Sequence, residues 1–306
     1  MSSRPPRRPV DGLLLLDKPL GLSSNAALQR ARWLLKAAKA GHTGTLDPMA
    51  TGLLPLAFGE ATKFSQLLLE ADKCYEAVLR LGVETDTGDA EGQVIATAPV
   101  AVDRRMVESA LARFRGEIEQ IPPMYSALKR DGKPLYEYAR ADIEVERAPR
   151  LVRIHTLALL DFDGDTLSLR VDCSKGTYIR TLAVDLGRVL GCGAHLTALR
   201  RTRIGPLNLS AAVTLEALEA VPEGPARDAM LAPVDTLVAH LPAIELDAVC
   251  AAAIMQGRQL PLPGTKAGQL RLYAAGRFLG IGQTDGQGRL LPKRLVANGA
   301  VGTALG

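Results

Sequence analysis

The 306-residue sequence has few of the residues that hold metals, disulfides or nucleotides. Its four cysteines, Cys74, Cys173, Cys192 and Cys250, are widely spaced and form no CxxC pair, which is typical of a reducing compartment. The four histidines are also far apart, and no HExxH sequence occurs. The nearest approach to a metal motif is Cys192-Gly-Ala-His195. We interpret it as structural, because a zinc site usually needs four protein ligands.

Motifs that bind phosphates or present a nucleophile are missing as well. The sequence contains no GxxxxGKS or GxxxxGKT phosphate loop, no GxGxxG after a predicted strand and no GxSxG elbow. Together with the scattered histidines, these absences disfavour nucleotide hydrolases, dehydrogenases and zinc hydrolases.

Long apolar segments are also lacking. The leucines of Leu13–Leu16 follow a Pro/Arg-rich leader but end at Asp17-Lys18, too early for a secretion signal. No segment approaches the ~20 apolar residues of a membrane-spanning helix, so we expect a cytoplasmic protein. With 47% hydrophobic and 23% charged residues the composition is globular, and a net charge of +4 permits a nucleic-acid partner without requiring one.

The patterns that are present predict both strands and helices. Alternation of apolar and polar residues predicts strands, and apolar residues every three or four positions predict helices. The expected elements are strands at 13–16, 74–81 and 167–173 and helices following Ser23, within 102–116 and from 179 to 190. In the helix within 102–116, we expect Met106, Ala110 and Phe114 to face the core. Without a βαβ rhythm, this mixture favours an α+β fold over a doubly wound sheet.

Changes in composition and pattern along the chain predict several structural units. We expect a mobile arm at residues 1–10, a large domain at 11–238, and an inserted arm at about 118–150, where Pro122-Pro123 and several tyrosines and basic residues interrupt the regularity. The sequence of residues 239–306 predicts a small β-barrel module. It would hold one helix at 247–256 and short strands LRLYAAG, RFLGIGQ, TDGQGR and LLPKRLV, separated by glycine-rich turns.

The segment GHTGTLDPMATG, residues 41–52, is polar and rich in glycine and threonine. Pro48 disfavours the helical region for the residue before it, so Asp47 should be held in an extended conformation. Glycines let a backbone approach a ligand closely. The loop could therefore present the Asp47 carboxylate to a ligand, although a surface turn with an Asx-type hydrogen bond is the alternative.

Two stretches of the sequence are basic and free of acidic residues. The first, between Asp17 and Asp47, holds Lys18, Arg30, Arg32, Lys36 and Lys39, and the second is Leu199–Arg203. They predict a surface that binds a polyanion, with an ordinary solvated helix face as the alternative. Tyr75 opens a predicted strand and Tyr178 a predicted helix. Both could offer an aromatic face to an unstacked base, or else be half-buried core residues.

Taken in order, several of these segments resemble the bacterial tRNA pseudouridine-55 synthases, the TruB family, along nearly the whole chain. Ser23 stands where many members have threonine. The matching segments are KPLGLSS (18–24), GHTGTLDPMATGLLP (41–55), GEATKFSQ (59–66), DKCY (72–75), GVETDTGDAEG (82–92), IPPMYSALKRDGKPLYEYAR (121–140), SKGTYIRTLAVDLG (174–187) and GAHLTALRRTRIG (193–205).

The resemblance implies a fold and a reaction. The fold would be α+β, a mixed and largely antiparallel sheet with flanking helices, an inserted RNA-binding arm and a small C-terminal PUA-like β-barrel. The reaction would convert uridine 55 in the T-arm of tRNA to pseudouridine by base flipping and aspartate nucleophilic catalysis. The N1–C1′ bond breaks, the base turns, and it is rejoined through C5. The resemblance implies no metal or cofactor, and a monomer.

The resemblance also implies roles for three catalytic residues. Asp47 corresponds to the catalytic aspartate and must be ionised when the base arrives. Arg180 matches the arginine that pairs with this aspartate and favours its charged form. Tyr75 matches the tyrosine that stacks on the target base, with proton transfer as a further role. Whether the carboxylate attacks the ribose or the uracil ring stays open at this stage.

Five other residues match substrate-binding positions. Tyr178 and Leu199 correspond to residues of the pocket that holds the base. His42 corresponds to the histidine that occupies the space left by the extruded nucleotide. Lys18 and Lys63 are candidates for phosphate contact or for a structural role.

Other functions remain open from the sequence. The main alternative is an RNA-binding or RNA-folding protein without catalysis, which the set of Asp47, Tyr75 and Arg180 disfavours because pure binding needs no carboxylate. A second is a pseudouridine synthase that acts on another RNA. A third, a metal-dependent nuclease, lacks a carboxylate cluster or a histidine pair.

Overall fold

A nine-stranded sheet forms the body of the molecule. The computed structural model describes residues 7–126, 128–141 and 143–297. The strand order is β1-β3-β12-β4-β11-β10-β7, with β2 added to β3 and β13 to β12. The strands are β1 (Gly12–Lys18), β2 (Ala40–His42), β3 (Ala50–Phe58), β4 (Lys73–Leu81), β7 (Gly116–Gln120), β10 (Arg150–Asp163), β11 (Thr166–Cys173), β12 (Ala194–Ile204) and β13 (Leu207–Asn208). Neighbours are antiparallel, except that β12 runs parallel to β3. The expected mixed, largely antiparallel sheet is confirmed.

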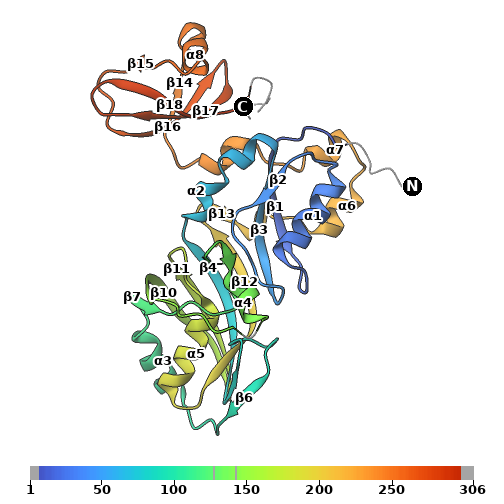
Figure 1. Ribbon diagram of the computed structural model, residues 1–306, viewed down its shortest axis with the longest axis vertical. Helices are drawn as coiled ribbons and strands as arrows, with labels where there is room; N and C mark the ends of the chain where they lie inside the picture. The colour runs from blue at the N-terminus through green and yellow to red at the C-terminus, as the bar shows by residue number, and fades with distance from the viewer. Residues whose placement is uncertain (1–6, 127, 142, 298–306) are drawn as a thin grey trace.

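Helices flank this sheet at both ends, with α1 and α6 beside β1 and β3 and with α3 and α5 beside β10 to β12 (Figure 1). The helices are α1 (Ser24–Leu34), α2 (Ser65–Leu69), α3 (Arg104–Ala112), α4 (Leu135–Ala139), α5 (Ile179–Leu190), α6 (Leu215–Ala220) and α7 (Pro225–Asp228), with 3-10 turns η1 (Gly59–Lys63), η2 (Leu209–Ala211) and η3 (Val234–Val238). Two small hairpins, β5 (Val83–Thr85) with β6 (Val94–Thr97) and β8 (Lys129–Arg130) with β9 (Lys133–Pro134), project from the body. Among the described residues, no helix has the length and apolar character needed to cross a membrane.

The predicted core face of α3 is partly wrong. Val107, Ala110 and Leu111 are buried, whereas Met106 is 45% exposed. Two apolar sets share this helix, and the i, i+3, i+4 set is the one that packs inward. The helix ends at Ala112, so Phe114 lies beyond its last turn, but Phe114 still packs against the main core cluster as expected.

The N-terminal segment is more ordered than expected. Arg8 forms a β-bridge with Ala37, and its guanidinium donates to the Asp228 carboxylate at 2.6 Å. Val10 is 6% exposed and belongs to the core. The prediction of a mobile arm is therefore wrong for residues 8–10, and residues 1–6 lie outside the described part.

A separate five-stranded sheet follows η3, in the order β14-β16-β17-β18-β15. Its elements are β14 (Ala243–Glu245), α8 (Ala248–Met255), β15 (Leu260–Pro261), β16 (Gly268–Ala274), β17 (Arg277–Thr284) and β18 (Arg289–Leu295). TDGQGR is mostly the turn between β17 and β18 rather than a strand, because Gly286 and Gly288 adopt positive φ angles of 76° and 86°. The sheet has the half-barrel form of a PUA-like module, and residues 298–306 lie outside the described part.

This second unit lies above α2 in Figure 1 and contacts the main body at η1. The Phe64 and Phe278 rings lie 5.5 Å apart, centroid to centroid. The Lys63 ammonium donates to the Leu295 carbonyl at 3.0 Å, and Arg294 donates to the Lys63 carbonyl at 2.9 Å. Apolar residues of β1, β3 and β17 share one buried cluster that spans the boundary between the two units, and each unit also has a core cluster of its own.

Candidate active site

A cleft of about 820 Å³ opens between the loop after β2, the segment around 86–93 and the inserted arm. His42 and Asp47 line it from the first loop, Arg180 from α5, and Lys129 and Arg140 from the arm. The structure thus brings Arg180 together with His42 and Asp47, two other candidates that lie more than 130 positions earlier in the sequence.

Asp47 reaches into this cleft from a loop that is held at its base. The Thr43 amide donates to the Pro55 carbonyl at 3.1 Å, and the Ala50 amide donates to the Asp47 carbonyl at 3.1 Å. The Asp47 side chain is 38% exposed, whereas Thr43 is fully buried. The loop therefore presents one accessible carboxylate from a fixed backbone, and the alternative of a simple solvated turn does not fit.

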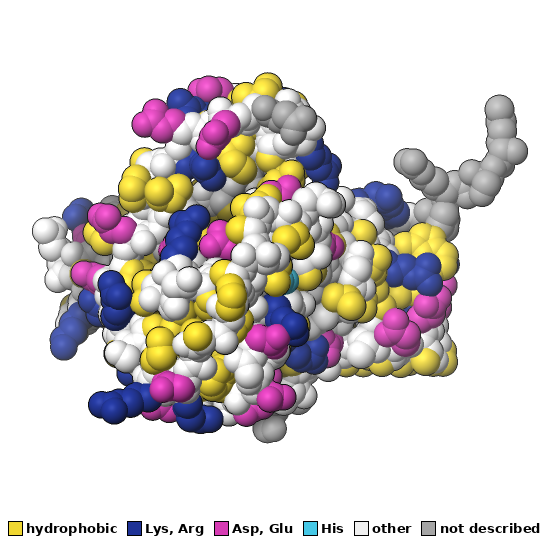
Figure 2. Space-filling model, turned by 90° about the horizontal axis from the view of Figure 1, so that it is seen from below, with side chains coloured by type: hydrophobic (Ala, Val, Ile, Leu, Met, Phe, Trp, Pro, Cys, Tyr) yellow, Lys and Arg dark blue, Asp and Glu magenta, His cyan; other side chains and the backbone are white. Residues whose placement is uncertain are grey.

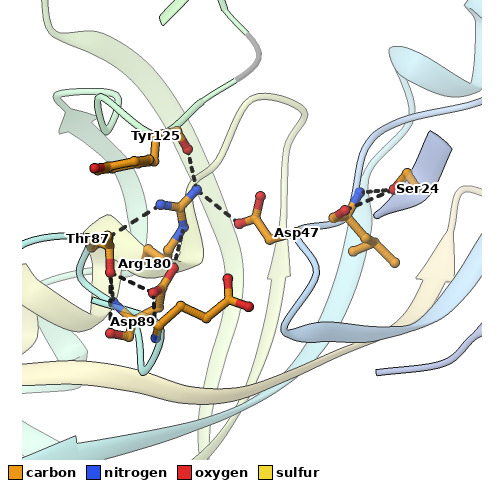
Figure 3. A network of polar contacts seen from close by, with 8 residues as sticks. Ser24, Asp47, Thr87, Asp89, Tyr125 and Arg180 are labelled. Atoms are coloured by element: carbon orange, nitrogen blue, oxygen red, sulfur yellow. Dashed lines mark hydrogen bonds and ion pairs between the residues drawn. The ribbon is translucent and has the colours of Figure 1, made fainter. Parts of the chain in front are cut away.

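Arg180 lies in the first turn of α5 and is the centre of a polar network (Figure 3). Its side chain is 6% exposed. One terminal nitrogen lies 2.9 Å from the Asp47 carboxylate and donates to the Tyr125 carbonyl at 2.5 Å. The other donates to the Thr87 carbonyl at 3.3 Å, and Nε lies 3.5 Å from the Asp89 carboxylate. A buried guanidinium needs such partners, because an unpaired buried charge is costly.

Asp89 and the Tyr125 carbonyl are parts of this network that the sequence did not reveal. Asp89 is as buried as Arg180, and its Oδ1 accepts hydrogen bonds from the Thr87 hydroxyl at 2.6 Å and the Glu91 amide at 3.0 Å. The segment GVETDTGDAEG holds several acidic residues, and no spacing among them distinguishes Asp89. A backbone carbonyl carries no sequence signal at all.

Burial and the charged side chains around the cleft shift the pKa values of neighbouring groups. Burial, followed by the neighbouring carboxylates of Asp89 and Asp47, raises the pKa of Glu91. Burial, aided by the Arg201 guanidinium, lowers the pKa of His42, so its imidazole is neutral at pH 7. The buried His42 Nδ1 has no hydrogen-bond partner among the residues that the structure describes.

Tyr75, Tyr178 and Leu199 surround the site but do not line the cleft itself. Tyr75 on β4 and Leu199 on β12 are each 9% exposed and belong to the main core cluster. Tyr178 precedes α5 and is half-buried. Burial raises the pKa of both phenols, and the Asp47 charge adds a smaller rise in each.

The contacts of Lys18 and Lys63 fit structural roles rather than phosphate contact. Lys18 is fully buried, and its ammonium donates to the Leu22 carbonyl at 2.6 Å and the Pro19 carbonyl at 2.9 Å. Lys63 pairs with Glu60 at 2.8 Å and helps to dock the second unit, as described above.

Lys18→Met should change how stability depends on pH. Burial lowers the pKa of Lys18 from 10.5 to about 8, so between these values the unfolded chain binds more protons than the folded one. The contribution of Lys18 to the free energy of unfolding therefore rises with pH between pH 8 and pH 10.5. We expect the difference in stability between wild type and Lys18→Met to shift in favour of wild type by on the order of 1 kcal/mol from pH 8 to 9.5. Urea denaturation at both pH values measures it, and parallel pH profiles would contradict the burial effect.

The two basic stretches are not free of counterions in the fold, and their contact with a polyanion stays a prediction. Four of their charges are matched by acidic residues from distant parts of the chain, and Arg201 is 1% exposed. The ion pairs are Arg30–Glu219, Lys36–Glu223, Arg200–Asp17 and Arg203–Asp172. On the face shown in Figure 2, lysines and arginines are likewise interspersed with acidic side chains. A stretch that contains no acidic residues in the sequence can therefore still have acidic neighbours in the folded protein.

Known family models match most of the chain. Residues 32–179 match the family model of the TruB family pseudouridylate synthase N-terminal domain. Residues 180–239 match the tRNA pseudouridylate synthase B C-terminal domain, and residues 242–296 match the pseudouridine synthase II TruB C-terminal model.

Similar proteins cover almost the whole chain. A protein of Aromatoleum aromaticum named tRNA pseudouridine synthase B is 70% identical over 291 residues, covering 95% of this chain and 94% of its own. One of the same name from an Azoarcus species is 65% identical, covering 97% and 98%. Among solved structures, the Cbf5-Nop10-Gar1 complex matches with 28% identity and a TM-score of 0.69, covering 90% of this chain and 79% of the matched one. The chain belongs to the TruB family of pseudouridylate synthases.

Proposed function

We propose that the protein converts uridine 55 in the T-arm of tRNA to pseudouridine. The observation that carries this proposal is the Asp47–Arg180 ion pair, 2.9 Å long, at the wall of a large cleft. The family gives the reaction class, and the names of the relatives that cover nearly the whole chain support tRNA as the substrate.

The reaction is an isomerisation in which atoms balance within the nucleotide. The N1–C1′ bond breaks, a C5–C1′ bond forms, C5 loses its proton and N1 gains one. Asp47 supplies the nucleophile, and Arg180 pairs with the carboxylate and aims it into the cleft.

The target nucleotide must leave the RNA stack to reach Asp47. Extruding a base costs a few kcal/mol, which protein contacts have to offset. Tyr75, Tyr178 and Leu199 match the family positions that hold the extruded base, and the neutral His42 ring takes the vacated place in the stack. The arm at about 118–150 holds the RNA through Lys129 and Arg140, and the module at 239–306 extends the binding surface of the catalytic domain at 11–238.

A tritium-release assay tests the proposal. A T-arm stem-loop transcript carrying uridine labelled with tritium at C5 should release about one equivalent of tritium, because C5 loses its hydrogen once per turnover. Mapping should then find pseudouridine at position 55. Tight binding without release would indicate an RNA-binding protein, and pseudouridine at another position would indicate a different specificity.

A further inference from the structure

Ser24 makes two hydrogen bonds to the residue that precedes Asp47. It is the first residue of α1 and is 1% exposed. Its hydroxyl donates to the Leu46 carbonyl at 2.9 Å and accepts from the Leu46 amide at 2.7 Å. One side chain therefore satisfies both backbone groups of Leu46, as a neighbouring strand would.

The residue that follows Asp47 is held by the same segment. The Pro48 carbonyl accepts a hydrogen bond from the Gly21 amide at 2.9 Å and lies 3.4 Å from the Lys18 ammonium. Residues 18–24 thus hold the backbone on both sides of Asp47. Of these contacts, the two from Ser24 are short side-chain bonds that a single substitution removes.

The direction of the Asp47 carboxylate depends on this backbone support. Figure 3 shows Ser24 on one side of Asp47 and Arg180 on the other. The carboxylate is partly exposed and is tied by Arg180 through one oxygen. The position of the carboxylate relative to a substrate is therefore set by two contacts. One is the ion pair with Arg180, and the other is the Leu46 backbone that Ser24 holds.

We propose that Ser24 is a positioning residue for catalysis, which fixes the Asp47 carboxylate by holding Leu46. The proposal rests on the proposed function. A displacement of about 1 Å in a reacting group can cost about 100-fold in rate. Loss of the Ser24 hydroxyl should therefore lower kcat while leaving the RNA-binding surface unchanged.

The adjacent Ser23 provides a matched control. Its hydroxyl caps α1 by accepting from the Ala26 amide at 3.1 Å and makes no bond to the Asp47 loop. Ser23→Ala removes the same atom from the neighbouring residue and lowers the stability of α1. If helix stability alone mattered, Ser23→Ala and Ser24→Ala would affect turnover alike.

The test compares kcat and RNA affinity for wild type, Ser23→Ala and Ser24→Ala. We expect Ser24→Ala to lose about 10- to 100-fold in kcat, with its Kd for the T-arm transcript within about 2-fold of wild type. Ser23→Ala should keep kcat within about 2-fold despite a lower urea midpoint. Equal kcat values for the two variants, with wild type active, would overturn the proposal for Ser24. Inactive wild type would instead overturn the proposed function.

Two further variants separate the hydrogen bonds from packing. Ser24→Thr keeps the hydroxyl and should recover most of the lost kcat, whereas an equal loss in Ser24→Thr and Ser24→Ala would contradict the role of the hydroxyl. If Ser24→Ala does not fold, Ser24→Cys replaces it, because a thiol is of similar size but is a weak donor and acceptor. Its kcat should fall in the same way, and full activity would overturn the proposal.

Discussion

Asp47→Asn is expected to abolish pseudouridine formation, with a loss in turnover on the order of 10⁴-fold or more. The amide has nearly the shape of the carboxylate but lacks its charge and nucleophilicity. Arg180 keeps Asp89 as a counterion, so the fold of the cleft should survive. Affinity for the T-arm transcript should stay within about 2-fold, because the carboxylate adds no attraction for a polyanion. Single-turnover tritium release and a filter-binding titration measure the two quantities.

Asp103→Asn is the control for this substitution. Asp103 caps α3 by accepting from the Met106 amide at 2.7 Å, and asparagine caps helices equally well. This variant should match wild type in rate and stability. Measurable pseudouridine formation by Asp47→Asn at comparable concentration would rule out Asp47 as the nucleophile.

Arg180→Lys is expected to lower turnover by about 100-fold or more, although the positive charge is kept. The Arg180 guanidinium reaches Asp47, Asp89 and the carbonyls of Tyr125 and Thr87 from three separate nitrogens. A lysine ammonium is a single point with three donors and cannot span these positions. Asp47 should then lose its fixed direction, so the fall should appear in kcat rather than in RNA affinity.

Arg188→Lys is a matched control on the same helix. Its side chain is 65% exposed and lies 3.7 Å from the Asp185 carboxylate, an arrangement that contributes little to stability. The variant should behave as wild type in the single-turnover assay. If Arg180→Lys did so as well, the fork geometry of Arg180 would be irrelevant to turnover.

Segments whose pattern reflects their own burial were predictable from the sequence. In β4, Tyr75, Ala77, Leu79 and Leu81 alternate with more exposed residues, as their spacing indicates, because one face of the strand packs on the core. For α3 the pattern was ambiguous, since two apolar sets overlap. Only the position of the neighbouring strands decides which set faces inward.

The candidate site was predictable to a smaller extent. Asp47 stood out in its loop, but its pairing with Arg180 came from family resemblance, since 133 residues separate them in the chain. Asp89 and the Tyr125 carbonyl join the network through tertiary contacts that leave no trace in local spacing. For the same reason the sequence did not show that several charges of the basic stretches are paired, because counterions such as Glu219 and Asp172 are supplied by distant elements.

The docking of the C-terminal sheet on η1 has a consequence for substrate choice. Phe64, Phe278 and the Lys63–Leu295 hydrogen bond hold that sheet at a set separation from the cleft. Under the proposed function, this fixed separation makes the molecule sensitive to the length of the bound RNA. An RNA that contacts both the cleft and the C-terminal sheet must present its target uridine at one distance from the far end of its stem. Stem length then contributes to substrate choice along with loop sequence.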